Sequence, residues 1–91
     1  MDSKKIVIQI KKALILLEDK YKSEPTDMLK MIIKKYREAC YILENNKVDR
    51  LSKEMISLRG LSRAYLEAYS DYLNPVLDEM NKVEKMIDST N

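Results

Sequence analysis

Glycine and proline are almost absent from this chain: Gly60, Pro25 and Pro75 are the only ones among its 91 residues. β-Sandwiches and barrels need many tight turns, several of them with positive φ, so this scarcity disfavours an all-β fold. Hydrophobic residues make up 45% of the sequence and charged residues 35%, a balance typical of a folded domain. A chain of this length forms one hydrophobic core. We therefore predict a single all-α domain spanning residues 1–91.

Apolar residues recur at helical spacing along nearly the whole chain. In one stretch they follow each other at intervals of 3, 4, 3 and 4, which is the seam of an amphipathic helix: Leu29, Ile32, Tyr36, Ala39 and Leu43. Spacing of this kind predicts four helices, at about residues 3–21, 24–45, 49–73 and 75–88. Because the connections are short, neighbouring helices should run antiparallel, as in a small four-helix bundle.

Capping residues predict where the helices begin. Ser23 or Glu24 is expected to start the second helix, with Pro25 in its first turn, where the missing N–H is not needed. Asn74 is expected to cap the fourth helix, and Pro75 to occupy its first turn. The alternative is a three-helix bundle whose third helix continues through Pro75 with a kink.

Two expectations concern burial. The first helix should be the most buried of the set, because Val7, Ile8, Ile15 and Leu16 widen its apolar face. Gly60 falls inside the pattern of the third helix, where glycine is unfavourable by about 1 kcal/mol relative to alanine. We therefore expect Gly60 to allow the close approach of another backbone.

The residues that usually carry catalysis are missing. The sequence has no histidine and no glycine-rich loop, so the commonest general base and a phosphate cradle are both absent. Cys40 has no evident partner for a nucleophilic site and is expected to be a packing residue. The carboxylate pairs Glu18-Asp19 and Asp78-Glu79 are adjacent, and adjacent helical residues point in different directions. We expect no catalytic residue, no metal ligand and no cofactor, and hence a protein that is not an enzyme.

A candidate binding surface comes from residues 59–74, which combine arginine and tyrosine, residue types enriched at protein interfaces. Arg59 and Arg63 lie one turn apart on the predicted third helix. Glu67, one turn further, can pair with Arg63; the other interpretation is an acidic partner held by both guanidinium groups. Tyr41 falls off the seam of the second helix and should be exposed. The predicted partner-binding residues are Arg59, Arg63, Glu67, Ser70, Asp71, Asn74 and Tyr41.

Charge is unevenly distributed, with a net +6 over residues 1–63 (15 Lys/Arg, 9 Asp/Glu) and a net −4 over residues 64–91 (2 and 6). Acidic residues are interspersed with the lysines and the pI is only 8.6, which disfavours nucleic-acid binding. The longest apolar run, residues 13–17, is too short to cross a bilayer, and the apolar face of the first helix is needed for the core, so no membrane role is expected. With one cysteine and no signal-peptide pattern, a cytoplasmic location is expected.

These features favour a non-catalytic protein-binding module whose partner is another protein. Small helical proteins without catalytic chemistry include bacterial and phage inhibitors, antitoxins and immunity proteins, which occlude a partner's surface, and we expect a function of this kind. The alternative is a self-associating structural or regulatory homodimer. A nonspecific nucleic-acid-binding protein is a third, less favoured interpretation.

Overall fold

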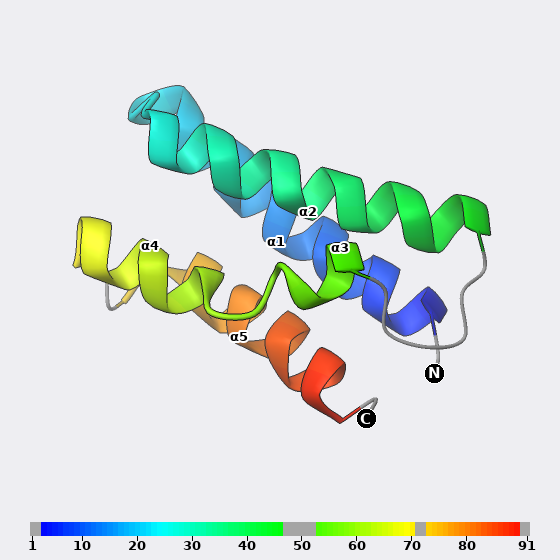
Figure 1. Ribbon diagram of the computed structural model, residues 1–91. Coiled ribbons are helices and arrows are strands. Elements are labelled where there is room, and N and C mark those ends of the chain that lie inside the picture. The colour runs from blue at the N-terminus through cyan, green and yellow to red at the C-terminus, as the bar shows by residue number, and fades with distance from the viewer. Residues whose placement is uncertain (1–2, 47–52, 71–72, 90–91) are drawn as a thin grey trace.

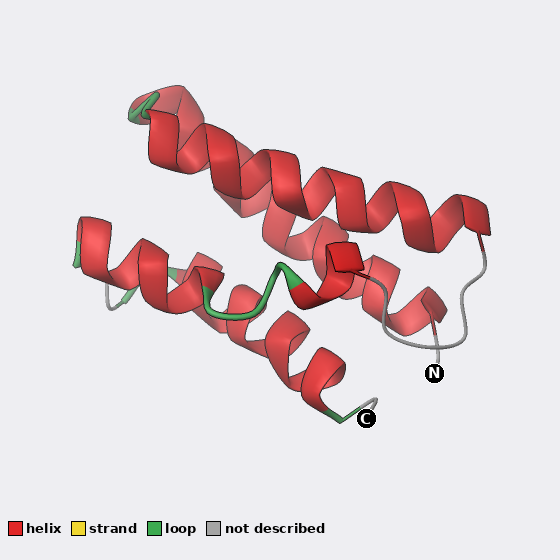
Figure 2. Cartoon of the chain, in the orientation of Figure 1, coloured by secondary structure: helices red, strands yellow, loops and turns green. Residues whose placement is uncertain are grey.

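Four helices and one additional helical turn form a computed structural model of the protein, which describes residues 3–46, 53–70 and 73–89 (Figure 1). The long helices are α1 (Ser3–Ser23), α2 (Asp27–Asn46), α4 (Leu61–Tyr69) and α5 (Pro75–Asp88), and the single turn is α3 (Lys53–Ile56). Figure 2 shows helices with short loops among the described residues, and these three ranges contain no strand. The predicted all-α four-helix bundle is confirmed.

The helices contact one another in the circular order α1, α2, α4, α5. α1 packs against α2 and α5, and α4 packs against the same two helices from the other side, while α3 contacts α2. Figure 1 shows α1 behind α2, and α4 crossing in front of α5. Consecutive long helices reverse direction, as predicted. α1 and α4 therefore lie at opposite corners of the bundle, and their outer faces point away from each other.

The core is built from the inward-facing residues of all these helices. Its two largest side chains, Tyr36 of α2 and Tyr65 of α4, are fully buried. The predicted seam of the second helix is confirmed, because each of its five residues is buried. The other fully buried apolar side chains are Ile10, Ala13, Leu17, Met55, Leu58, Val76, Met80, Val83 and Ile87.

One polar side chain of α1 joins the core. Gln9 is only 5% exposed, and its amide nitrogen donates to the backbone oxygen of Glu79 (3.0 Å) and to its Oε2 (2.6 Å). The bond from Gln9 is also the main reason that the pKa of Glu79 is lowered. Because α1 and α5 are far apart in the sequence, these bonds fix the position of one helix along the other.

The expectation for the width of the buried face of α1 is wrong in part. Ile8 and Ile15 are 56% and 63% exposed, and Val7 and Leu16 are only partly buried. At 3.6 residues per turn, Ile8 and Ile15 lie on the side of the helix opposite Ile10. α1 packs mainly against α2 and α5, and its Lys20 lies over the ring of Tyr69 of α4 (5.6 Å to the ring centroid), so the side that carries Ile8 and Ile15 is left exposed.

The first connection differs from the prediction by three residues. α1 continues through Ser23 and α2 begins at Asp27, so neither Ser23 nor Glu24 starts the second helix, and Pro25 precedes that helix. Thr26 is the residue that caps α2, since its Oγ1 accepts a hydrogen bond from the backbone N–H of Leu29 (3.3 Å). The hydroxyl groups of Thr26 and Tyr69 also form a hydrogen bond, which joins this connection to the end of α4.

The single third helix predicted for residues 49–73 is wrong. The described part of that segment contains α3 and α4, separated by a turn in which Leu58 and Arg59 donate to carbonyl groups three residues back (3.0 and 3.1 Å). Gly60 follows in the left-handed conformation, with φ +83° and ψ −4°, which residues with a Cβ rarely adopt. A Cβ at Gly60 would meet no atom within 4 Å, so the expected close backbone approach is also wrong. Residues 49–52 and 71–72 lie outside the described residues.

α4 receives its cap from another helix. Its N-cap residue, Gly60, has no side chain to offer, but the carboxylate of Glu84 on α5 accepts hydrogen bonds from the backbone N–H groups of Gly60 (3.0 Å) and Ser62 (2.9 Å). The first N–H groups of a helix have no partner within the helix, and a negative charge there also complements the helix dipole. Glu84 therefore stabilises the break in the chain and ties α4 to α5.

The start of α5 is confirmed as predicted. Asn74 has extended backbone angles, and its Oδ1 accepts a hydrogen bond from the N–H of Val76 (2.9 Å), while Pro75 is the first residue of the helix. The alternative of one long helix kinked at Pro75 is therefore wrong.

Gly60→Ala should lower the free energy of unfolding by about 1–2 kcal/mol, because a Cβ disfavours the left-handed conformation. Gly60→Asn is the matched control and should lose less, since asparagine tolerates this region. Urea unfolding followed by circular dichroism measures both. The sign of the change in the free energy of unfolding distinguishes the two conformations of Gly60. If Gly60 were inside a helix, alanine would stabilise the protein by about 1 kcal/mol instead.

Glu84→Gln should lower the free energy of unfolding by about 1–2 kcal/mol, because a neutral amide presents one oxygen where the carboxylate presents two. The backbone amides of Gly60 and Ser62 should then exchange hydrogen faster. Asp88→Asn is the control on the same helix, since Asp88 pairs only with the partly exposed Arg59 and such pairs contribute at most about 1 kcal/mol. Equal losses in the two variants would show that the cap contributes no more than a surface ion pair.

Candidate interaction surface

Both arginines predicted to bind a partner are paired within the protein. Arg59 lies in the turn before α4, and its Nη2 and Nε contact Oδ1 of Asp88 on α5 (2.7 and 2.9 Å). Arg63 lies on α4 and pairs with Glu67 one turn on (3.2 Å), as one of the two interpretations predicted. Because the chain breaks at Gly60, Arg59 and Arg63 do not belong to one helix, and helical spacing no longer places them on one face.

Two of the other predicted residues have structural roles at the end of α4 and the start of α5. Ser70 has a positive φ of 51°, and its backbone N–H donates to the Leu66 carbonyl (2.8 Å), which ends α4. The side chain of Asn74 caps α5. Leu73, beside it, is 97% exposed. Asp71 lies outside the described residues.

Tyr41 is exposed, as predicted, but it lies far from the predicted residues at the end of α4. With Arg37, Glu38, Ile42 and Glu54 it lines a shallow hollow of about 410 Å³ where α3 meets α2. It follows the first residue of α2 by 14 residues, or about 21 Å of helix. Figure 1 shows the end of α4 beside the start of α2, at the opposite end of the bundle. Tyr41 therefore does not share a surface with Ser70 at the end of α4.

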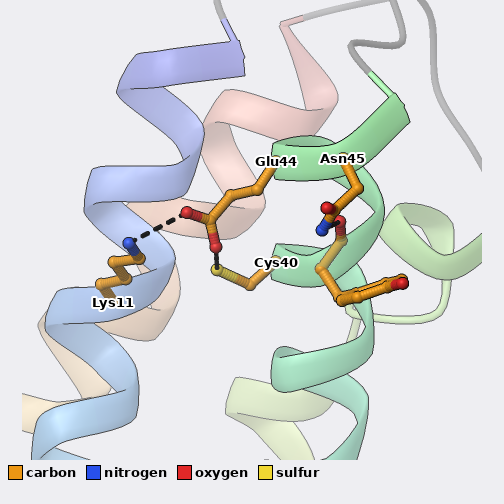
Figure 3. Close-up of polar contacts among 5 residues, drawn as sticks. Lys11, Cys40, Glu44 and Asn45 are labelled. Carbon is orange, nitrogen blue, oxygen red and sulfur yellow. Dashed lines mark hydrogen bonds and ion pairs between the residues drawn. The ribbon is translucent and has the colours of Figure 1, made fainter.

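A polar cluster joins α1 to the C-terminal part of α2 (Figure 3). The carboxylate of Glu44 accepts a hydrogen bond from the thiol of Cys40 (3.2 Å) and forms an ion pair with Lys11 of α1 (3.1 Å). Asn45 turns the other way, and its amide donates to the backbone oxygen of Tyr41 (2.8 Å). Burial first, and then the hydrogen bond and charge of Glu44, raise the pKa of Cys40 to about 11. The thiol is protonated at neutral pH, and this form is a poor nucleophile.

The outer face of α1 carries exposed apolar side chains between lysines. Ile8 and Ile15 lie seven residues apart, which places them on the same side of the helix. Around them the exposed charged residues of the helix are Lys4, Lys5, Lys11, Lys12, Asp19 and Lys22. The helical spacing of the sequence predicts both isoleucines in the core, which is wrong. The signal that could have separated them is their phase, since they do not share the side occupied by Ile6, Ile10 and Leu17.

A groove between α1 and α2 continues this basic surface. Its volume is about 540 Å³, Ile33 contributes an apolar patch, and Arg37 forms an ion pair with Glu18 across it (3.1 Å). Its cationic side chains come from both helices: Lys22, Lys30, Lys34 and Arg37. The α1–α2 pair carries ten Lys and Arg and six Asp and Glu between residues 3 and 46. The uneven charge seen in the sequence thus becomes a basic side of the molecule.

Within residues 3–46, 53–70 and 73–89, no group of three or more His, Cys, Asp or Glu side chains is arranged to hold a metal ion. None of the helices in the described part of the chain combines the length and apolar character needed to cross a membrane. The polar clusters described above are ion pairs and helix caps.

Cys40 should react slowly with iodoacetamide in the native protein. A pKa raised from 9.0 to about 11 lowers the thiolate fraction at neutral pH roughly 100-fold. The rate, followed by mass spectrometry, should keep rising through pH 10, and unfolding in urea should restore ordinary reactivity. Glu44→Gln removes the neighbouring charge but not the burial, so it should recover only part of the difference. Equal rates in native and unfolded protein would contradict this account of the thiol.

Comparison with known proteins gives one family. Residues 2–91 match the family described as YeeD uncharacterised protein. The chain is 39% identical over 88 residues to the uncharacterized protein YeeD of Bacillus subtilis (strain 168), an alignment that covers 92% of this chain and 87% of the relative. No solved structure shows significant similarity to the chain. The match over nearly the whole length shows that this chain belongs to the YeeD family.

Proposed function

We propose that the protein is a non-catalytic protein-binding module, an inhibitor, antitoxin or immunity protein that occludes the surface of another protein. We also propose that it acts in the cytoplasm of a bacterium. The origin of its relative in Bacillus subtilis supports the second proposal, as does a single cysteine whose thiol is buried and without a disulfide partner.

The observation that carries this proposal is the pair of isoleucines on the outer face of α1. The core is complete without Ile8 and Ile15, since the inward face of α1 already buries Ile6, Ile10 and Leu17. Covering the exposed parts of the two isoleucine side chains provides roughly 2–4 kcal/mol before the costs of association are subtracted. An apolar row that folding does not use, set among charges, is typical of a surface that binds a protein.

Two surfaces compete for this role. The first is the outer face of α1. The second is the predicted one on α4, where Arg63 is 84% exposed and Glu67 lies beside it. Because α1 and α4 occupy opposite corners of the bundle, one compact partner cannot cover both. We favour α1, because the exposed row on α4 between Arg63 and Ser70 contains no large apolar side chain.

The purified chain should elute as a monomer of 10.7 kDa in size-exclusion chromatography with light scattering. Added to a nuclease-treated extract of its host, it should form a complex of defined stoichiometry with one other protein. A dimer of the purified chain would support the alternative, a self-associating structural or regulatory protein. Loss of the complex on nuclease treatment would point to nucleic acid.

Ile8→Ser with Ile15→Ser should abolish that complex and leave the free energy of unfolding nearly unchanged, since both side chains are more than half exposed. Arg63→Glu is the matched variant on the other surface. It should keep the complex and also fold normally, because exposed charges contribute at most about 1 kcal/mol. The reverse pattern, with binding lost only in Arg63→Glu, would return the binding site to the α4 surface predicted from the sequence.

A further inference from the structure

We propose that the outer face of α1 is a docking surface for an acidic amphipathic helix of the partner protein. This inference rests on the proposed function and adds the chemistry of the partner. It combines two observations on one helix face: a spaced pair of exposed isoleucines and the lysines on both sides of them.

The spacing of the isoleucines fits a helix as the occupant. Ile8 and Ile15 are two turns apart, about 10.5 Å along the axis, and both side chains project from the same side. A helix that packs along another helix presents an apolar residue every three or four positions, so two such residues fall within this distance. The exposed face runs from Lys4 to Lys22, about 27 Å, which matches a partner helix of about 18 residues.

The lysines beside the isoleucines predict which charged residues the partner helix carries. Lys4, Lys11 and Lys22 lie on the α2 side of the isoleucine row, and Lys5 and Lys12 lie on the α5 side. Lys11 is already paired with Glu44, and Asp19 is the one exposed acid on this face. Lys12 also lies near enough to Glu79 of α5 to lower the pKa of that carboxyl group. Counting Asp19, Glu44 and Glu79 against the five lysines, the face keeps a net positive charge. A helix with Asp or Glu on either side of an apolar row would match both edges, whereas a basic helix would be repelled.

Two other occupants fit less well. A second copy could present α5, with the exposed Asp78 and Asp88 but no large exposed apolar side chain, or the hollow around Tyr41, where Arg37 lies beside Glu38 and Glu54. A lipid surface is bound by helices with a broad apolar face that often includes aromatic residues. Here the apolar row is one residue wide, lysines flank it closely, and the exposed face of α1 has no aromatic residue.

The test uses the full ¹⁵N-labelled chain and two synthetic peptides of about 20 residues, long enough to form helix on binding. Both peptides have leucine at the same heptad positions; the flanking positions are glutamate in one and lysine in the other. The glutamate peptide should shift the amide resonances of α1 and bind at least about 10-fold more tightly than the lysine peptide. Its affinity should fall as salt rises from about 0.05 to 0.5 M, because salt screens exposed charges.

The variant Lys4→Glu/Lys12→Glu/Lys22→Glu should reverse the preference between the peptides. Lys35→Glu/Lys53→Glu/Lys85→Glu is the control with the same change in net charge, and it should leave the preference unchanged. Equal binding of the two peptides, no binding of either, or shifts confined to other helices would overturn the proposal. Binding to phosphatidylglycerol vesicles but not to the glutamate peptide would assign the face to lipid instead.

The outcome can be separated from that of the proposed function. If the host extract yields a complex and the glutamate peptide does not bind, the acidic helix is excluded while the protein-binding function stands. If the purified chain is a dimer, the proposed function itself fails.

Discussion

The carboxylate of Glu84 allows the second half of the chain to fold back on itself. At Gly60 the chain leaves α3 and begins α4 with N–H groups that no nearby side chain satisfies, and Glu84 accepts hydrogen bonds from two of them. α5, which carries Glu84, is in turn held on α1 by the bonds between Gln9 and Glu79. The position of α4 in the bundle therefore depends on a series of polar contacts that passes through α5 to α1.

Tyr36 has a buried hydroxyl group that lowers the stability of the fold. Its ring fills the centre of the core, yet its hydroxyl has no hydrogen-bond partner among the described residues. Burial, and secondarily the negative charge of Glu84, raise the pKa of this hydroxyl, so it stays neutral. An unpaired buried hydroxyl costs about 1–3 kcal/mol, and burial of the aromatic ring offsets it.

The sequence predicted the number of main helices and the inward-facing residues well, but not the break near Gly60. Met55, Leu58, Leu61 and Tyr65 are all buried, so the helical spacing of apolar residues continues across the break. A turn closed by hydrogen bonds to the third residue back advances the chain almost in phase with a helix, and a pattern of apolar residues cannot distinguish the two. Gly60 was the available signal, because a helix commonly ends where glycine allows a positive φ.

The binding residues were harder to predict, because a sequence does not state how many neighbours a helix has. Ile8 and Ile15 look like core residues until the bundle shows that helix packing leaves one side of α1 exposed. Conversely, Arg59 looked available until the fold placed Asp88 within 2.7 Å of it. Tyr41 was predicted to be exposed for a local reason, its position off the seam of α2, and that prediction is confirmed.

The ion pairs between α1 and α2 determine where positive charge remains. Glu44 and Glu18 meet Lys11 and Arg37 across the seam of the two helices, and Glu24 pairs with Lys20 near the end of α1. These acids are therefore neutralised at the seam and the helix end. By contrast, Lys4 and Lys22 form no ion pair with any described residue, and Lys12 has a longer-range electrostatic interaction with Glu79, although all three lie beside the exposed isoleucines. Thus the contacts that align α1 with α2 also leave the outer face of α1 both apolar and basic, which is the combination that an acidic helix would complement.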